Sequence, residues 1–185
     1  SFDPSANGGL GAASLVKDVQ TSGNYSFLPG NFTAIGSTLY FVGTDWSAGS
    51  KLYKTDGTGS GTVLVKDFVS APVATNLIDV NGTLYLSATT SDGGTELWKS
   101  DGTTSGTVRV ADINPGTASS SPSNFVVLDN TLYFTATNST SGTELWRTTS
   151  TGAELVADIV SGSGSASPSL LKVFNGKLLF KAADS

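Results

Sequence analysis

The sequence contains no cysteine, no histidine and no methionine. Without cysteine, the chain cannot be held together by disulfides and cannot bind a metal ion through thiolates. Without histidine, it lacks the commonest general base of enzymes and the commonest ligand of transition metals. These absences exclude the function classes that depend on thiol or imidazole chemistry.

Charged residues are also scarce. They make up 14% of the 185 residues, and 10 basic side chains stand against 15 acidic ones, so the formal net charge is -5. Such a chain offers no positive surface to a phosphate backbone, and we do not expect nucleic acid as a partner. No run of apolar residues is long enough to cross a bilayer, so no membrane span is predicted.

Helical patterning is missing as well. Nowhere do apolar residues recur with the helical period over ten or more residues. Glycine, serine and threonine are abundant, and leucine, valine, isoleucine and phenylalanine occur in short clusters, which is typical of short strands joined by tight turns. The sequence therefore predicts an all-β protein.

What the chain does contain is repetition, with an interval of roughly 46 residues. One phrase reads KLYKTDGT from Lys51, ELWKSDGT from Glu96 and ELWRTTST from Glu144. A second reads LVKD from Leu15 and Leu64, RVAD from Arg109 and LVAD from Leu155, and a third reads TLYF, TLYL, TLYF and KLLF from Thr38, Thr83, Thr131 and Lys177. Repeated units of this size are typical of stacked architectures, whereas a catalytic centre needs one unrepeated cluster of reactive groups.

Each repeat offers four short strands separated by turn dipeptides such as Asp101-Gly102 and Asn81-Gly82. This matches the size of a β-propeller blade, in which a small twisted sheet packs both faces on its neighbours. We therefore predict a β-propeller-like array of four antiparallel four-stranded repeats, or blades, within a single domain. That domain covers residues 15–185, and its repeats are approximately 15–58, 59–103, 104–151 and 152–185.

One strand is missing from this count, because the ELW phrase occurs three times and the other phrases four times. We expect either an N-terminal arm, residues 1–14, or a neighbouring subunit to complete one blade, since an open ladder edge invites self-association. In the arm, Phe2 and Leu10 are the large apolar residues and the candidates for self-assembly. A homo-oligomer or polymer is the partner that this predicts.

The stretch ELWKSDGTTSGTVRVADINPG, Glu96 to Gly116, followed by LDNTLYFTA from Leu128, resembles the ELWxxDGT repeat family of large bacterial secreted or surface proteins. The resemblance extends over nearly all of the chain from Leu15 onward. It departs where KLY replaces the first ELW and where Thr149 replaces the signature aspartate. The resemblance implies an extracellular, propeller-like module secreted by a bacterium, with a structural or adhesive role and no catalysis.

The repeated aromatic residues Tyr53, Trp98 and Trp146 are interpreted as core residues between sheets rather than as a platform for a ligand. Trp46 and Tyr25 fall outside the repeat pattern and are the candidates for an exposed surface contact, for example with a glycan. The Ser-rich stretches 117–123 and 161–167 are interpreted as flexible surface linkers.

Aspartates recur at fixed positions, which are Asp18, Asp67, Asp112 and Asp158 at the end of one strand and Asp56 and Asp101 in the DGT turns. Their oxygens would suit calcium, but the dense ligand spacing of a calcium loop is missing, so we interpret them as turn caps and assign no cofactor. Glutamate occurs only at Glu96, Glu144 and Glu154, and two of these are repeat equivalents. The sequence thus favours a non-enzymatic structural protein that assembles with itself, with a carbohydrate-binding or adhesive propeller as the alternative.

Overall fold

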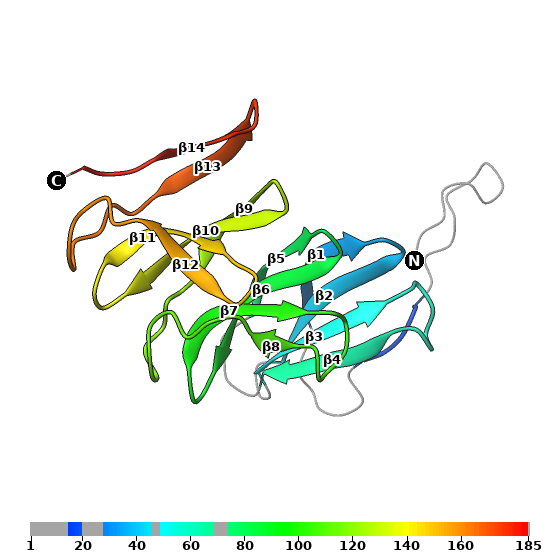
Figure 1. The fold of residues 1–185 in the computed structure, drawn as a ribbon. Helices are drawn as coiled ribbons and strands as arrows, with labels where there is room; N and C mark the ends of the chain where they lie inside the picture. The colour runs from blue at the N-terminus through cyan, green and yellow to red at the C-terminus, as the bar shows by residue number, and fades with distance from the viewer. Residues whose placement is uncertain (1–14, 20–27, 46–48, 69–73, 185) are drawn as a thin grey trace.

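The computed structural model describes residues 15–19, 28–45, 49–68 and 74–184, and within them it contains strands and no helix. The first sheet consists of β1 (Leu28–Ile35), β2 (Thr38–Asp45), β3 (Gly49–Thr55) and β4 (Val63–Phe68), and the second of β5 (Thr75–Val80), β6 (Thr83–Thr90), β7 (Gly94–Ser100) and β8 (Val108–Arg109). The third consists of β9 (Ser123–Leu128), β10 (Thr131–Asn138), β11 (Gly142–Thr148) and β12 (Ala153–Ala157), and the fourth of β13 (Ser169–Phe174) and β14 (Lys177–Lys181) (Figure 1). The all-β prediction is confirmed, and no helix of the described part could span a membrane.

Each sheet is an antiparallel meander, in which every strand pairs with the next one along the chain. Local sequence explains the tight turns. Asn81 and Gly82, which join β5 to β6, have φ of 50° and 85°, and Asn175 and Gly176, which join β13 to β14, have φ of 49° and 68°. Two consecutive positive φ angles match the right-handed twist of the flanking strands, and asparagine and glycine adopt them at the lowest cost.

The sheets do not begin where the sequence repeats were expected to begin. The LVKD phrase that opens each expected unit forms the last strand of the preceding sheet, since Leu64 lies in β4, opposite Tyr53 of β3, and Leu155 lies in β12, opposite Trp146 of β11. The physical reason is the turn between the ELW and LVKD phrases, which folds the second phrase back on the first. The earliest LVKD phrase, at residues 15–18, forms no strand.

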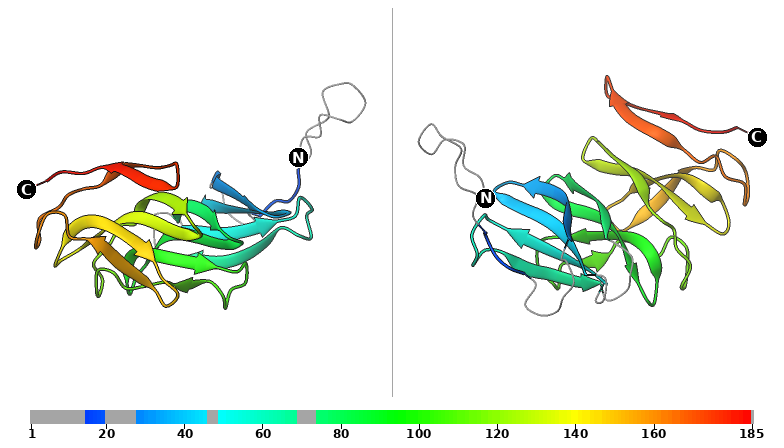
Figure 2. Two further views of the ribbon diagram at one scale, coloured as in Figure 1. Left: turned by 45° about the horizontal axis from the view of Figure 1, so that its top comes forward. Right: turned by 180° about the vertical axis from the view of Figure 1, so that it is seen from behind.

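The four sheets lie in a row (Figures 1 and 2); the first three pack face to face, and the fourth lies along the third through β13 and β9. The interface between the first and second sheets buries Tyr40, Val42, Leu52, Val65 and Phe68 against Leu84, Leu86, Ala88 and Trp98. The interface between the second and third sheets buries Val80, Leu97 and Ile113 against Leu132, Phe134, Ala136 and Trp146. Both faces of the second sheet are therefore covered. This explains why its strands carry apolar side chains on both faces and not only at every second position.

The first strands of the sheets lie along one another, β1 against β5, β5 against β9 and β9 against β13. Each of them is bent at a residue in the left-handed region, which is Asn31, Asn76, Asn124 or Leu170 with φ of 52°, 56°, 55° and 56°. At two of these bends the side-chain amide reaches the next sheet, because Asn76 Nδ2 donates to the Pro122 carbonyl (3.2 Å) and Asn124 Nδ2 to the Pro168 carbonyl (3.5 Å). Leu170 holds the same backbone conformation with no polar group to offer.

Candidate functional site

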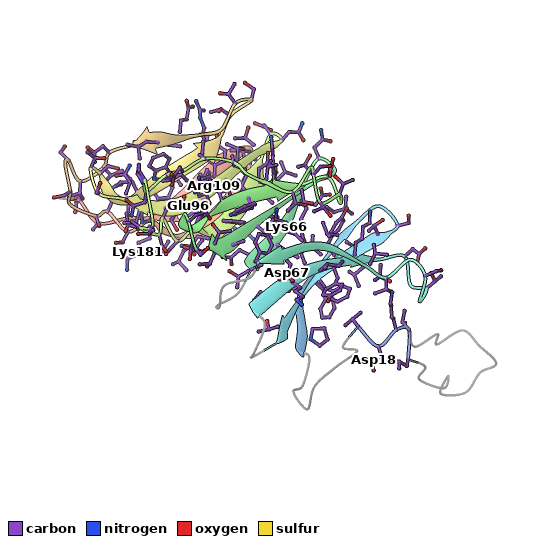
Figure 3. The ribbon with its side chains drawn as sticks, turned by 90° about the horizontal axis from the view of Figure 1, so that it is seen from below. Asp18, Lys66, Asp67, Glu96, Arg109 and Lys181 are labelled. Atoms are coloured by element: carbon purple, nitrogen blue, oxygen red, sulfur yellow. The ribbon has the colours of Figure 1, made fainter. Side chains whose placement is uncertain are left out.

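The carboxylate of Glu96 in β7 is a buried polar group that accepts three hydrogen bonds. Its side chain is completely buried. Oε1 accepts a hydrogen bond from the Ser120 backbone N–H (2.9 Å), and Oε2 accepts one from the Ser120 hydroxyl (2.6 Å) and one from the Ile113 N–H (3.1 Å). Glu96 thus holds both ends of the chain segment that runs from the second sheet to the third. Figure 3 shows Glu96 in the middle part of the row.

The same connecting segment is hydrogen-bonded to the sheets on both of its sides. On the second sheet, Thr95 N–H donates to the Ser119 hydroxyl (2.9 Å), and Ser121 N–H donates to the Thr95 carbonyl (3.0 Å). On the third sheet, Thr137 N–H donates to the Ser120 carbonyl (2.8 Å). We call this arrangement, with Glu96 at its centre, the inter-sheet clamp, because it ties one sheet to the next through their connection.

A second inter-sheet clamp surrounds Glu144 in β11, which is also completely buried. Its carboxylate accepts from the N–H groups of Ala166 (2.8 Å) and Ile159 (3.3 Å), and Ala183 N–H after β14 donates to the Ala166 carbonyl (2.8 Å). Gly142 is the first residue of this strand, with φ of 63°, and a side chain there would overlap the Gly164 carbonyl. Glycine is therefore required, both for its conformation and for the close approach of the connection.

The first sheet departs from this arrangement. Lys51 stands where Glu96 and Glu144 stand in the next two sheets, and its Nζ lies 3.4 Å from the Asp67 carboxylate of β4. The ammonium group of lysine carries only donors, so it cannot accept backbone N–H groups as a carboxylate does. The glutamate clamp is thus a feature of the second and third sheets, and the connection 69–73 lies outside the described residues.

Burial also sets the electrostatics of the clamp. Loss of water raises the pKa of Glu96, and the hydrogen bonds from Ser120 and Ile113 offset only part of this effect. A raised carboxyl pKa in a cleft would suggest a general acid. Here three acceptor positions of the carboxylate are occupied by the chain's own donors and the side chain has no exposed surface. The arrangement is suited to holding backbone rather than to reaching a substrate.

The DGT turns are built around their aspartates. Asp101 Oδ1 accepts from the Thr103 N–H (2.8 Å) and the Thr103 hydroxyl (2.7 Å), and the Gly106 N–H donates to the Thr103 hydroxyl oxygen (2.9 Å). Asp56 makes the corresponding bonds with Thr58 (2.9 and 2.7 Å). These hydrogen bonds lower the pKa of both aspartates, because they stabilise the ionised form. The carboxylates act as caps of their own turns, which is the role that the sequence favoured over calcium binding.

Gly106 is the residue of this turn that cannot change. A Cβ built on Gly106 would overlap the carboxylate of Asp101, and the same holds for Gly61 and Asp56. We expect Gly106→Ala to push the aspartate out of its bonds and to lower the free energy of unfolding by about 1 to 3 kcal/mol, which is typical of overpacking. Urea denaturation followed by circular dichroism measures the loss. Gly30→Ala is the matched control, since neither glycine has a positive φ and nothing lies within 4 Å of the Gly30 Cβ position; a loss in this control as large as that in Gly106→Ala would contradict the overlap argument.

The corresponding turn of the third sheet closes without an aspartate. Thr149 takes its place, and its N–H donates to the Gly152 carbonyl (2.9 Å) while its hydroxyl accepts from the Gly152 N–H (3.1 Å). The turn is shorter, and its geometry needs no carboxylate. Across the described residues, acidic side chains do not gather in groups of three or more that could hold a metal ion.

The repeated aromatic residues lie on the sheet faces. Trp98 contacts Phe68 of the first sheet edge to face, with ring centroids 5.3 Å apart, and the Lys66 ammonium lies 5.6 Å from its ring. Trp146 lies in the interface between the second and third sheets. Both indole N–H groups are buried and lack a hydrogen-bond partner among the described residues, so the contribution of these rings comes from the contacts of their faces and edges. Tyr53 is buried on the outer face of the first sheet, stacked on Phe41 at 5.4 Å.

The other predicted contact residues, Phe2, Leu10, Tyr25 and Trp46, lie outside the described residues. Their assignment to self-assembly and to surface binding stays a prediction. What the sequence analysis missed is the Ser-rich connection, which it treated as a flexible linker although Ser120 and Ala166 are at most 1% exposed. The signal was available, because Gly-Thr-Glu occurs twice, at Gly94 and Gly142, and a Ser-rich stretch follows each copy, with the bonded backbone N–H 24 and 22 residues after the glutamate.

Comparisons of the chain with protein-family models, with curated proteins and with solved structures find no match. A function must therefore be argued from the geometry itself.

Proposed function

We propose that this chain is a non-enzymatic, extracellular structural module, a propeller-like array of blades that assembles with copies of itself by completing its last blade. The single observation that carries the proposal is the last sheet. It consists of β13 and β14 alone, whereas each of the preceding sheets has four strands. An open strand edge with apolar side chains is a ready template for another chain.

Side-chain burial supports the idea that the last sheet is incomplete. Phe180 of β14 corresponds in the hairpin register to Leu86 of β6 and Phe134 of β10. Leu86 and Phe134 are completely buried, but Phe180 is 39% exposed. In the second and third sheets the neighbouring ELW strand covers this position, since Trp98 lies opposite Leu86 and Trp146 opposite Phe134. The fourth sheet has no such strand among the described residues.

The propeller-like reading rests on the repeated meanders, on their face-to-face packing and on the first strands, which lie side by side along the row. The extracellular location in this proposal comes from the resemblance to the ELWxxDGT repeat family. Glu96 and Glu144 of the ELW phrases are enclosed in the inter-sheet clamps. A catalytic carboxylate would have to be accessible to a substrate, so this enclosure supports a structural role.

The test is the mass of the 185-residue chain in solution, measured by light scattering over a range of concentrations. The proposal expects assemblies far above the 18.8 kDa of one chain. We further expect that deleting Phe2 to Ala13 reduces the assembly if the N-terminal arm supplies the missing strand. A chain that stays monomeric at every concentration, and that binds glycans with an affinity lost in Trp46→Ala, would favour the adhesive alternative.

A further inference from the structure

The row of sheets ends in two different faces, one on the fourth sheet and one on the first. The end face is the side of the β13–β14 hairpin that carries Phe174 and Leu179 together with Lys172 and Lys177. The start face is the side of the first sheet that carries Phe32, Phe41, Tyr53 and Leu64. Inside the row, the equivalents of these two faces are packed on each other.

The end face repeats the side of the second sheet that packs on the third. In the fourth sheet Phe174 lies opposite Lys177 and Lys172 opposite Leu179, just as Val80 lies opposite Thr83 and Ile78 opposite Tyr85 in the second. Val80, Ile78 and Tyr85 all pack in the interface with the third sheet. Phe174 and Leu179, which hold the corresponding positions, are 62% and 51% exposed. The end face is thus an inter-sheet face with nothing stacked on it among the described residues.

The start face repeats the side of each later sheet that packs on its predecessor. Phe32, Phe41 and Tyr53 form a run of rings with centroids 6.0 and 5.4 Å apart, and Leu64 lies opposite Tyr53. The corresponding residues of the third sheet are Phe125, Phe134, Trp146 and Leu155, and all of them pack against the second sheet. On the start face, Phe32 and Leu64 are 58% and 48% exposed.

The segment Leu15–Val19 indicates where a preceding sheet would lie. A Cβ on Gly59, in the β3–β4 turn of the first sheet, would lie 2.9 Å from the Val16 carbonyl. A Cβ on Gly152, in the β11–β12 turn of the third sheet, would lie 3.5 Å from the Val110 carbonyl, and Val110 follows the last strand of the second sheet. Lys17 Nζ also donates to the Thr62 carbonyl (2.7 Å). The segment therefore occupies, next to the first sheet, the place of the last strand of a preceding one.

Charge favours the same arrangement. Three of the ten cationic side chains, Lys172, Lys177 and Lys181, belong to the β13–β14 hairpin, although the whole chain has a net charge of -5. The rest of the chain carries 7 basic and 15 acidic side chains, since 10 − 3 = 7, so the hairpin is attracted to a second copy. Lys181 and Asp18 lie toward opposite ends of the row (Figure 3).

From these observations we infer that the end face of one copy docks on the start face of a second copy, head to tail, so that the row of sheets continues across the junction. This rests on the proposed self-assembly and specifies its geometry. The two faces differ, so the contact is heterologous and does not close on itself as a twofold dimer would. The expected product is an open chain of copies, or a ring where the rotation between successive copies closes.

The experiment uses one variant of each face, Leu179→Glu on the end face and Phe32→Glu on the start face. Both side chains are more than half exposed, so the fold should survive, which circular dichroism checks. A charge in the centre of an apolar contact should raise the concentration needed for assembly at least about 30-fold. Val108→Glu is the matched control, because Val108 is an exposed apolar residue (39%) within the row and should leave assembly unchanged.

Mixing the two variants gives the decisive result. Each variant alone should be monomeric, whereas an equimolar mixture should form dimers and nothing larger, because one intact end face and one intact start face remain. Assembly of either variant alone to the extent of the unmodified chain would overturn the head-to-tail geometry while leaving self-assembly intact. An unmodified chain that stays monomeric would overturn both. If either variant misfolds, Phe174→Glu or Leu64→Glu replaces it on the same face.

Discussion

Replacing Trp98 with alanine is expected to lower the free energy of unfolding by about 3 to 5 kcal/mol, the range measured for truncating large buried aromatic residues. Trp98 is 9% exposed and packs against Phe68 across the interface of the first two sheets. The loss should be large because the cavity would open between two separate sheets, each of which shields the apolar side chains of the other from water. Chemical denaturation followed by circular dichroism measures it without relying on the fluorescence of the removed ring.

Trp98→Phe is the matched variant. Phenylalanine keeps a ring for Phe68, and the indole N–H that it removes has no partner among the described residues, so no hydrogen bond is lost. We expect a clearly smaller loss than for alanine. Equal losses in the two variants would mean that the N–H, and not the ring, carries the stabilisation, against the packing argument.

Glu96→Ala is the second change with a large expected effect. It would leave the Ile113 N–H and the Ser120 N–H without their buried acceptor, and the Ser120 hydroxyl would keep only its longer hydrogen bond, to the Thr95 carbonyl (3.3 Å). Unpaired buried donors cost about 1 to 3 kcal/mol each, and their effects are not fully additive, so we expect a total loss of about 3 to 5 kcal/mol. The control is Glu154→Ala, which removes a surface pair with Arg147 and should cost less than about 1 kcal/mol. Similar losses in both variants would contradict the clamp.

The raised pKa of Glu96 gives this prediction a second readout. The folded state binds this proton more tightly than the unfolded state does, so the stabilising contribution is fully present below the ordinary pKa of 4.5 and is lost as the pH rises through the raised value. The lowered pKa of Asp101 acts with the opposite sign, below 3.8. The stability difference between the unmodified chain and Glu96→Gln should therefore fall as the pH rises from about 4 to 8. A difference that grows with pH would contradict burial as the dominant cause.

Much of the strand pattern was predictable from the sequence. The expected turns at Asn81-Gly82 and Asp101-Gly102 separate β5 from β6 and β7 from β8, because turn dipeptides and apolar clusters act locally. The partnership of strands was harder to predict. Nothing in a short LVKD phrase says whether it pairs with the ELW strand before it or opens a new unit, and this choice depends on how the long DGT turn folds back.

The clamp was not predictable from composition. A serine-rich stretch looks solvated, and only the buried carboxylate of Glu96 on a neighbouring strand turns Ser120 into an interior residue. Likewise, the sequence analysis considered the glutamates only in relation to catalysis. Their role in holding the backbone becomes visible only in the structure, where the connection packs against β7. Tertiary contacts, in both cases, override what the local composition indicates.

The bend at Leu170 has a mechanical consequence. At Asn76 and Asn124 the bend comes with an amide that fastens one sheet to the next, but Leu170 bends the strand with an apolar side chain that is 78% exposed. A junction between two docked copies would therefore lack the amide hydrogen bond that links the second sheet to the third and the third to the fourth. Under tension, a filament of docked copies should break at the contacts between copies before any copy unfolds. The pieces should be whole subunits that can assemble again.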